Sequence, residues 1–149
     1  MSLVRPLGMA DIDAAVRIEE TCFSHPWSAN VYHATLLLPY AHYFAAVEDG
    51  QIVGTIGVQF LGGDGEISNV AVLPQYRRRG IAHELLEHVL RNTEGFGNGD
   101  YTLEVRKGNT AARALYESFG FVTEGVRKGF YTQPSDDALI MWRRKNKEK

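Results

Sequence analysis

The sequence predicts an α+β domain in which a central mixed, mostly antiparallel sheet of about six or seven strands is flanked by about four helices. Three observations predict this class. Apolar residues have helical spacing over residues 11–38, β-rich segments separated by turn residues follow over 43–72, and helix and strand patterns then alternate over 80–142. Because no repeat or linker interrupts this order, we expect a single domain over residues 1–149.

Composition excludes several classes of protein. A chain of 149 residues with 44% hydrophobic content can bury a real core, and its net charge of −2 gives no global basic field for nucleic acid. No apolar run approaches the roughly 20 residues of a membrane span, and the N-terminus lacks the pattern of a signal peptide. We therefore expect a cytoplasmic protein that binds neither nucleic acid nor membrane; the sequence does not specify its oligomeric state.

The N-terminal segment is expected to contain a short strand over residues 3–5 and then two helices. Residues 11–23 carry apolar side chains at helical intervals. Ser28 can cap a second helix that runs to about Leu38, and Pro39 ends that helix.

A β-meander is expected next. Residues 43–48 and 51–60 have strand-like composition and are joined through Asp49-Gly50, a hairpin signal. A third strand over 66–72 follows a glycine-rich turn. These strands should therefore pair in antiparallel fashion.

The C-terminal half alternates helices and strands. Residues 80–91 and 109–118 have one apolar face each and are expected to be helices. Strands are expected over residues 101–105, 121–126 and 138–142. Since one helix joins the strands 66–72 and 101–105, a right-handed crossover would make them parallel neighbours.

The most informative stretch runs from Val70 to Ala82, as strand, turn and helix. The first turn of a helix has unpaired N–H groups and the positive end of the dipole, which suit an anion. Gly80 lets the backbone approach a ligand closely, and the preceding residues 77–79 are all arginine. A solvated basic turn is the alternative interpretation. The strand, Gly80, the small residue Ala82 and the helix that follows together favour a pyrophosphate site over that alternative. The Walker motif and the dinucleotide-binding motif are both absent.

The pattern Arg77-x-x-Gly80-x-Ala82 resembles the Arg/Gln-x-x-Gly-x-Gly/Ala signature of the GNAT superfamily of N-acetyltransferases. The resemblance implies the GNAT fold, with a parallel pair of strands splayed around an acetyl-CoA cleft. It also implies a bulge in the strand before the loop, whose free backbone groups pair with the pantetheine arm. The residues that it assigns to acetyl-CoA binding are Val70, Ala71, Val72, Arg77, Arg78, Arg79, Gly80, Ile81, Ala82 and Asn109.

Further motifs resemble those of the bacterial ribosomal-protein-alanine N-acetyltransferases, the RimI-like enzymes. They are the segment 23–28, which contains Pro-Trp-Ser, the Leu-Glu-Val-Arg of residues 103–106, the segment 109–121, and Tyr131 with residues 137–141. Phe130 stands where those enzymes often have a second tyrosine. The resemblance implies that the acceptor is a protein N-terminal amine, namely the N-terminal alanine of small-subunit ribosomal protein eighteen. A lysine or small-molecule amine acceptor, or a catalytically silent CoA-binding regulatory domain, are the alternatives.

Glu104 and Tyr116 are the candidate catalytic residues. Acetyl transfer to an amine needs a proton acceptor for the amine and a proton donor for the leaving thiolate. Glu104 projects to the strand face opposite its two apolar neighbours, and the resemblance assigns it the role of base, with Glu66 as the second candidate. Tyr116 lies at the edge of an apolar helix face, and the resemblance places it beside the CoA sulfur. A polar strand face and a packing tyrosine are the simpler interpretations of these two residues.

Histidine and cysteine spacing indicates neither metal nor thiol chemistry. The five histidines lack the spacing of metal ligands, and the single cysteine, Cys22, is expected to be a buried structural thiol. We therefore expect no metal, and a direct transfer from acetyl-CoA to the amine without an acyl-enzyme.

Overall fold

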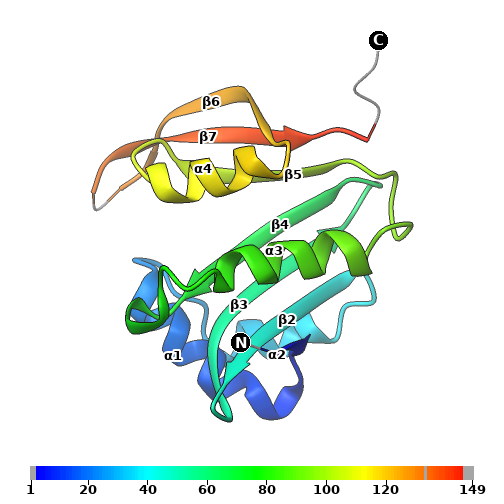
Figure 1. The fold of residues 1–149 in the computed structure, drawn as a ribbon, viewed down its shortest axis with the longest axis vertical. Coiled ribbons are helices and arrows are strands. Elements are labelled where there is room, and N and C mark those ends of the chain that lie inside the picture. Colours follow the sequence, from blue (N-terminus) through cyan, green and yellow to red (C-terminus); the bar gives the residue numbers. More distant parts are fainter. Residues whose placement is uncertain (1–2, 133, 146–149) are drawn as a thin grey trace. The chain divides into compact units, whose positions relative to one another are not determined.

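The computed structural model describes residues 3–132 and 134–145 (Figure 1). The strands are β1 (Leu3–Pro6), β2 (Ala41–Glu48), β3 (Gln51–Phe60), β4 (Gly65–Val72), β5 (Tyr101–Arg106), β6 (Val122–Tyr131) and β7 (Asp136–Arg143). The helices are η1 (Met9–Asp11), α1 (Ile12–Cys22), α2 (Ala29–Leu36), η2 (Pro74–Tyr76), α3 (Ile81–Asn92) and α4 (Thr110–Ser118). The strands form one sheet in the order β1-β2-β3-β4-β5-β7-β6, which confirms the predicted mixed, mostly antiparallel class.

The chain divides into two compact units. The first contains residues up to 59 and residues 67–94, and the second contains residues 60–66 and those from 95 onward. Whether residues 1–149 act as one domain stays a prediction.

In the first unit, β1, β2 and β3 pair in antiparallel fashion. The turn between β2 and β3 is Asp49-Gly50, with φ values of 52° and 77°. Two consecutive positive φ values are the signature of the type I′ turn, whose twist matches that of a hairpin. The predicted hairpin is therefore confirmed.

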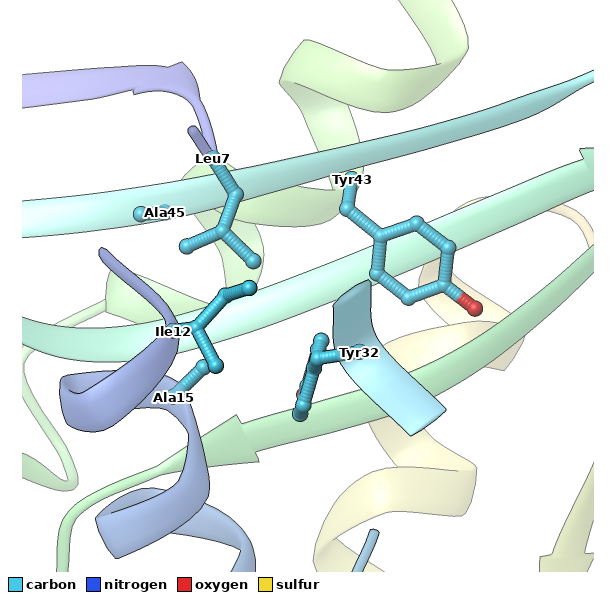
Figure 2. Packing of buried hydrophobic residues seen from close by; sticks show 6 residues of the cluster. All are labelled: Leu7, Ile12, Ala15, Tyr32, Tyr43 and Ala45. Atoms are coloured by element: carbon cyan, nitrogen blue, oxygen red, sulfur yellow. The ribbon is translucent and has the colours of Figure 1, made fainter. Parts of the chain in front are cut away.

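Strand β2 is covered on both faces, with α1 and α2 on one side and α3 on the other (Figure 1). The core on the α1–α2 side consists of Leu7, Ile12, Ala15, Tyr32, Tyr43 and Ala45 (Figure 2). On the other side, the Phe44 ring contacts that of His88 in α3, with ring centroids 5.0 Å apart. Because both faces of β2 are buried, its central residues are apolar in succession and do not alternate with polar ones.

Gly57 in β3 makes room for the Tyr43 ring. A Cβ at Gly57 would lie 2.1 Å from Cε2 of Tyr43, which no packed structure tolerates. The ring therefore crosses β3 at Gly57, and its hydroxyl points away from Leu7 and Ile12 (Figure 2).

In the second unit, β7 lies between β5 and β6 and pairs with both in antiparallel fashion. The first residues of β4 pair in parallel with β5, Gly65 opposite Tyr101 and Glu66 opposite Thr102, so the predicted parallel neighbours are confirmed. Strand β6 is longer than the predicted 121–126, because its register with β7 continues to Tyr131.

Side chains cap the starts of two helices, one of them at Ser28 as predicted. The Ser28 hydroxyl accepts a hydrogen bond from the Val31 amide at 3.3 Å at the start of α2, and the Asn109 side chain accepts one from the Ala112 amide at 3.2 Å at the start of α4. Each side chain satisfies one of the unpaired first-turn donors. No helix in the described part of the chain is long and apolar enough to cross a membrane.

Candidate functional site

The loop between β4 and α3 belongs to the first unit and has the geometry of an anion site. Arg78 and Gly80 have φ values of 67° and 81°, so the chain turns sharply just before the helix. Gly80 is the N-cap of α3, and no side chain caps this helix. A Cβ at Gly80 would have no atom within 4 Å, so open space lies in front of the loop. These features fit a pyrophosphate held by main-chain amides.

Two arginines of this loop, Arg77 and Arg79, contact neighbouring residues of the first unit. Arg77 turns back, and its Nε donates to the Val72 carbonyl at 2.9 Å while Nη2 lies 3.6 Å from the Cys22 sulfur. Arg79 lies over the Tyr76 ring at 5.0 Å and forms an ion pair with Glu48 at 3.6 Å. Arg77 therefore ties the loop to the end of β4.

Cys22 is a half-buried thiol at the end of α1. Burial raises its pKa, although Arg77 opposes this effect, so the neutral thiol is favoured. A neutral thiol is a poor nucleophile, so a structural role stays the prediction, but the thiol is half-buried where the sequence predicted a buried one.

The other residues of the first unit that were predicted to bind acetyl-CoA lie at the end of β4 and at the start of α3. Val70 is half-buried, whereas Ala71 and Val72 are buried at the end of β4. Ile81 is buried in the first turn of α3, and Ala82 next to it is half-buried.

Glu104 lies on β5 in the second unit. Leu103 and Val105 are buried and Glu104 is exposed, as the strand alternation predicted. Its Oε2 lies 3.4 Å from Nε of Arg127 on β6. Glu66, the second candidate base, is exposed at the start of β4, opposite Thr102.

Tyr116 is buried on α4, against the Phe121 ring. Burial, with a smaller contribution from Tyr131, raises the pKa of Tyr116 to about 12. The pKa of Tyr131 is also raised, first by burial and then by the negative charge of Glu104. Burial is thus the main cause of both raised pKa values, and the neighbouring Tyr131 and Glu104 add smaller contributions.

Arg106 was not among the predicted site residues, yet it holds Tyr131 in place. Its guanidinium lies 4.3 Å from the Tyr131 ring centroid, and its nitrogens donate to the carbonyls of Pro134 at 2.7 Å and Thr132 at 3.4 Å. A cation over an aromatic face fixes the ring orientation. The sequence signals for Arg106 were its place in the Leu-Glu-Val-Arg motif and its position on the same strand face as Glu104.

Two further residues that sequence reasoning missed are Glu19 on α1 and Asn69 on β4. The Glu19 side chain is buried, and Asn69 donates a hydrogen bond to it at 2.7 Å. The available signal was that Glu19 lies seven residues after Ile12 and four after Ala15, on the apolar face of its helix.

Within residues 3–132 and 134–145, no group of three or more histidine, cysteine, aspartate or glutamate side chains is arranged to hold a metal ion.

Asn109, which caps α4, is exposed in the second unit.

Comparison with known proteins identifies the family. A model of the acetyltransferase (GNAT) family matches residues 12–121. The putative ribosomal protein bS18-alanine N-acetyltransferase of Bacillus subtilis is 36% identical over 140 residues, 93% of this chain and 93% of that protein. The ribosomal protein bS18-alanine N-acetyltransferase of Escherichia coli K12 is 34% identical over 143 residues, 95% and 96% of the two chains. The crystal structure of the ribosomal-protein-S18-alanine N-acetyltransferase from Escherichia coli superposes with a TM-score of 0.86 at 33% identity, covering 95% of this chain and 92% of that one. The chain therefore belongs to the GNAT family and is an acetyl-CoA-dependent N-acetyltransferase.

Proposed function

We propose that this enzyme transfers the acetyl group of acetyl-CoA directly to a protein N-terminal amine, and that its acceptor is the N-terminal alanine of ribosomal protein bS18. The names of the two sequence relatives and the Pro26-Trp27-Ser28 motif support this acceptor. The observation that carries the chemistry is the buried, protonated hydroxyl of Tyr116 on α4, the helix that directly follows the strand of Glu104. An acceptor on a ribosomal protein places the reaction in the cytoplasm.

The loop at the start of α3 is the proposed binding element for the CoA pyrophosphate. Main-chain amides of Gly80, Ile81 and Ala82 would contact it, and the three arginines would support the loop and add positive charge. The main chain of residues 70–72 would pair with the pantetheine arm. The family resemblance also assigns Asn109 to that arm.

Glu104 is the proposed base. An α-amino group has a reference pKa of about 7.7–8.0, against about 10.4 for lysine, so only a mild base is required. Glu104 accepts the proton of the amine, directly or through a water, as the nitrogen–carbonyl bond forms and the carbon–sulfur bond breaks. Its carboxylate also forms an ion pair with Arg127 on β6, at 3.4 Å.

Tyr116 is the proposed donor to the sulfur. With a pKa of about 12, Tyr116 keeps its proton throughout the neutral range. A thiol has a reference pKa of about 8.5, so complete proton transfer from this tyrosine to a thiolate is uphill. We therefore assign Tyr116 the role of a hydrogen-bond donor that stabilises the developing thiolate, with net protonation completed by the proton released from the amine.

Thiol release tests this function. The enzyme is incubated with acetyl-CoA and a hexapeptide that begins Ala-Arg, and free CoA thiol is measured over time. The matched control is the same peptide with its N-terminus already acetylated. Release with the free peptide and none with the control supports the proposal.

Other acceptors give distinct outcomes in the same assay. Release with a polyamine but not with the free peptide refutes the protein acceptor, and release with an N-acetylated peptide that contains lysine indicates a lysine acetyltransferase. Binding of acetyl-CoA without release from any acceptor indicates a silent CoA-binding domain.

A further inference from the structure

The buried carboxylate of Glu19 joins three separate segments of the first unit. Glu19 is 1% exposed, and its Oε1 accepts a hydrogen bond from the Trp27 amide at 2.9 Å. Its Oε2 accepts from the Tyr32 hydroxyl at 3.0 Å and from Nδ2 of Asn69 at 2.7 Å. A carboxylate is costly to bury, and such a set of donors is what makes its burial tolerable.

Tyr32 is a permanent donor in this network. Its pKa is raised well above the usual tyrosine value, first by burial and then by the charge of Glu19. The hydroxyl therefore stays protonated at all physiological pH values. The Tyr32 ring also packs edge-on against Trp27, with centroids 5.1 Å apart.

Asn69 carries the network into β4. Its φ of 56° is left-handed, although it lies inside a strand, and non-glycine residues rarely adopt this conformation. Asparagine is among the residues that tolerate it best, and a left-handed residue is also the first position of one common type of β-bulge. Val70, Ala71 and Val72 follow directly, so the conformation of Asn69 sets the direction of the main chain that leads to the pyrophosphate loop.

The Asn69 side chain is held from both ends. Its Oδ1 accepts hydrogen bonds from Ser68 at 2.8 Å and Tyr43 at 3.3 Å, which leaves its amide group to donate to Glu19. Thr55 donates to the Asn69 carbonyl at 3.0 Å. The unusual backbone conformation is therefore anchored by side chains from β2, β3 and α1.

The Trp27 amide belongs to the Phe23–Ser28 segment that joins α1 to α2. The Trp27 ring packs against Tyr43 as well as Tyr32, with the Tyr43 centroid 5.8 Å away. One carboxylate thus fixes this segment through Oε1 and the β4 main chain through Oε2.

We propose that Glu19 is a positioning residue for both substrates: it sets the main chain of residues 69–72 for acetyl-CoA and the Phe23–Ser28 segment for the acceptor. The acceptor half of this inference rests on the proposed function, in which the Pro26-Trp27-Ser28 motif of that segment supports the identity of the acceptor. Neither Glu19 nor Asn69 touches the reacting atoms in this scheme.

The acetyl-CoA half is tested with Asn69→Gly and the matched control Tyr32→Phe. Each variant removes one donor from the same oxygen of Glu19, and glycine retains the left-handed backbone without strain. Isothermal titration calorimetry with acetyl-CoA should show binding weakened by roughly tenfold in Asn69→Gly, the worth of one hydrogen bond to a charged group. Tyr32→Phe leaves the bond between Glu19 and Asn69 in place, so it should bind acetyl-CoA within about twofold of wild type, although the thermal midpoint falls in both variants. Equal acetyl-CoA affinity in the two variants would overturn the inference.

The acceptor half is tested with Glu19→Gln. Asn69→Gly keeps the bond to the Trp27 amide, so its KM for the Ala-Arg hexapeptide should stay at the wild-type value. Glu19→Gln weakens both arms and should raise the peptide KM as well as the dissociation constant for acetyl-CoA. An unchanged peptide KM in a folded Glu19→Gln enzyme would refute this half. A wild-type enzyme that binds acetyl-CoA without acetylating the peptide refutes the proposed acceptor. Because calorimetry with acetyl-CoA needs no acceptor, the comparison of Asn69→Gly with Tyr32→Phe still decides the role of Glu19 in acetyl-CoA binding.

Discussion

Substitution of Gly80 by alanine separates ligand binding from backbone strain. Gly80 has a φ of 81°, and an added Cβ would have no atom within 4 Å. Gly50, in the turn between β2 and β3, has a φ of 77° and equally empty surroundings. Gly50→Ala is therefore a matched control that carries the same conformational cost at a site remote in sequence from the loop.

The expected magnitudes follow from this geometry. An alanine in the left-handed region costs about 1–2 kcal/mol, so each variant should lose about that much free energy of unfolding. For a domain of this size each kcal/mol lowers the thermal midpoint by about 2–4 °C. Only Gly80→Ala should also place a methyl group where the pyrophosphate meets the main chain. Loss of one hydrogen bond to a charged group, worth about 1.5–3 kcal/mol, corresponds to at least roughly tenfold weaker acetyl-CoA binding.

Calorimetric titration of both variants with acetyl-CoA, beside their thermal unfolding, measures the two effects separately. The two variants should lose similar amounts of stability, and Gly80→Ala alone should show a large loss of acetyl-CoA affinity. If Gly80→Ala bound acetyl-CoA as tightly as Gly50→Ala, the loop would not be the pyrophosphate site.

Three further predictions concern catalysis and pH. Tyr116→Phe should slow thiol release by about 100-fold or more while calorimetric acetyl-CoA affinity is unchanged, and wild-type turnover would contradict its role. Glu104→Gln should lower turnover and change the pH dependence of the rate, and an unaltered pH profile would exclude it as the base. A hydrogen bond from Arg5 lowers the pKa of Asp11 in the folded protein. The pair therefore stabilises the fold at pH values above the ordinary aspartate pKa of about 3.9. This contribution is lost as the pH falls through the lowered pKa of Asp11 in the folded state. Arg5→Gln should accordingly lower the free energy of unfolding by up to about 1 kcal/mol at neutral pH and by almost nothing near pH 2, as measured by urea unfolding. An equal loss at both pH values would argue against the ion pair.

Features with local causes could be predicted from the sequence. Asp49-Gly50 specifies a hairpin turn because few residues accept two positive φ values in succession. Ser28 and Asn109 specify helix starts because their side chains reach an amide three residues ahead. The exposed face of β5 that carries Glu104 likewise follows from simple alternation.

The length of β6 was harder to predict because its cause is not local. Its last part contains Lys128-Gly129, which has little strand propensity, and the predicted strand therefore ended at residue 126. The pairing of Arg127 with Ala138 and of Tyr131 with Asp136 extends it. Cross-strand partners outweigh propensity in such a hairpin.

By itself, the sequence determined the order of the helices and strands, the loop at Gly80 and the candidate pair Glu104 and Tyr116, since each depends on neighbouring residues or a short motif. Only the tertiary structure decided that Arg77 turns back to β4 and that burial keeps Tyr116 protonated. The tertiary structure alone also joined Glu19 to Asn69, 50 residues further along the chain. Periodicity reports which face of an element is buried, but it carries no information on which distant side chain meets that face, because only the folded chain brings the two together.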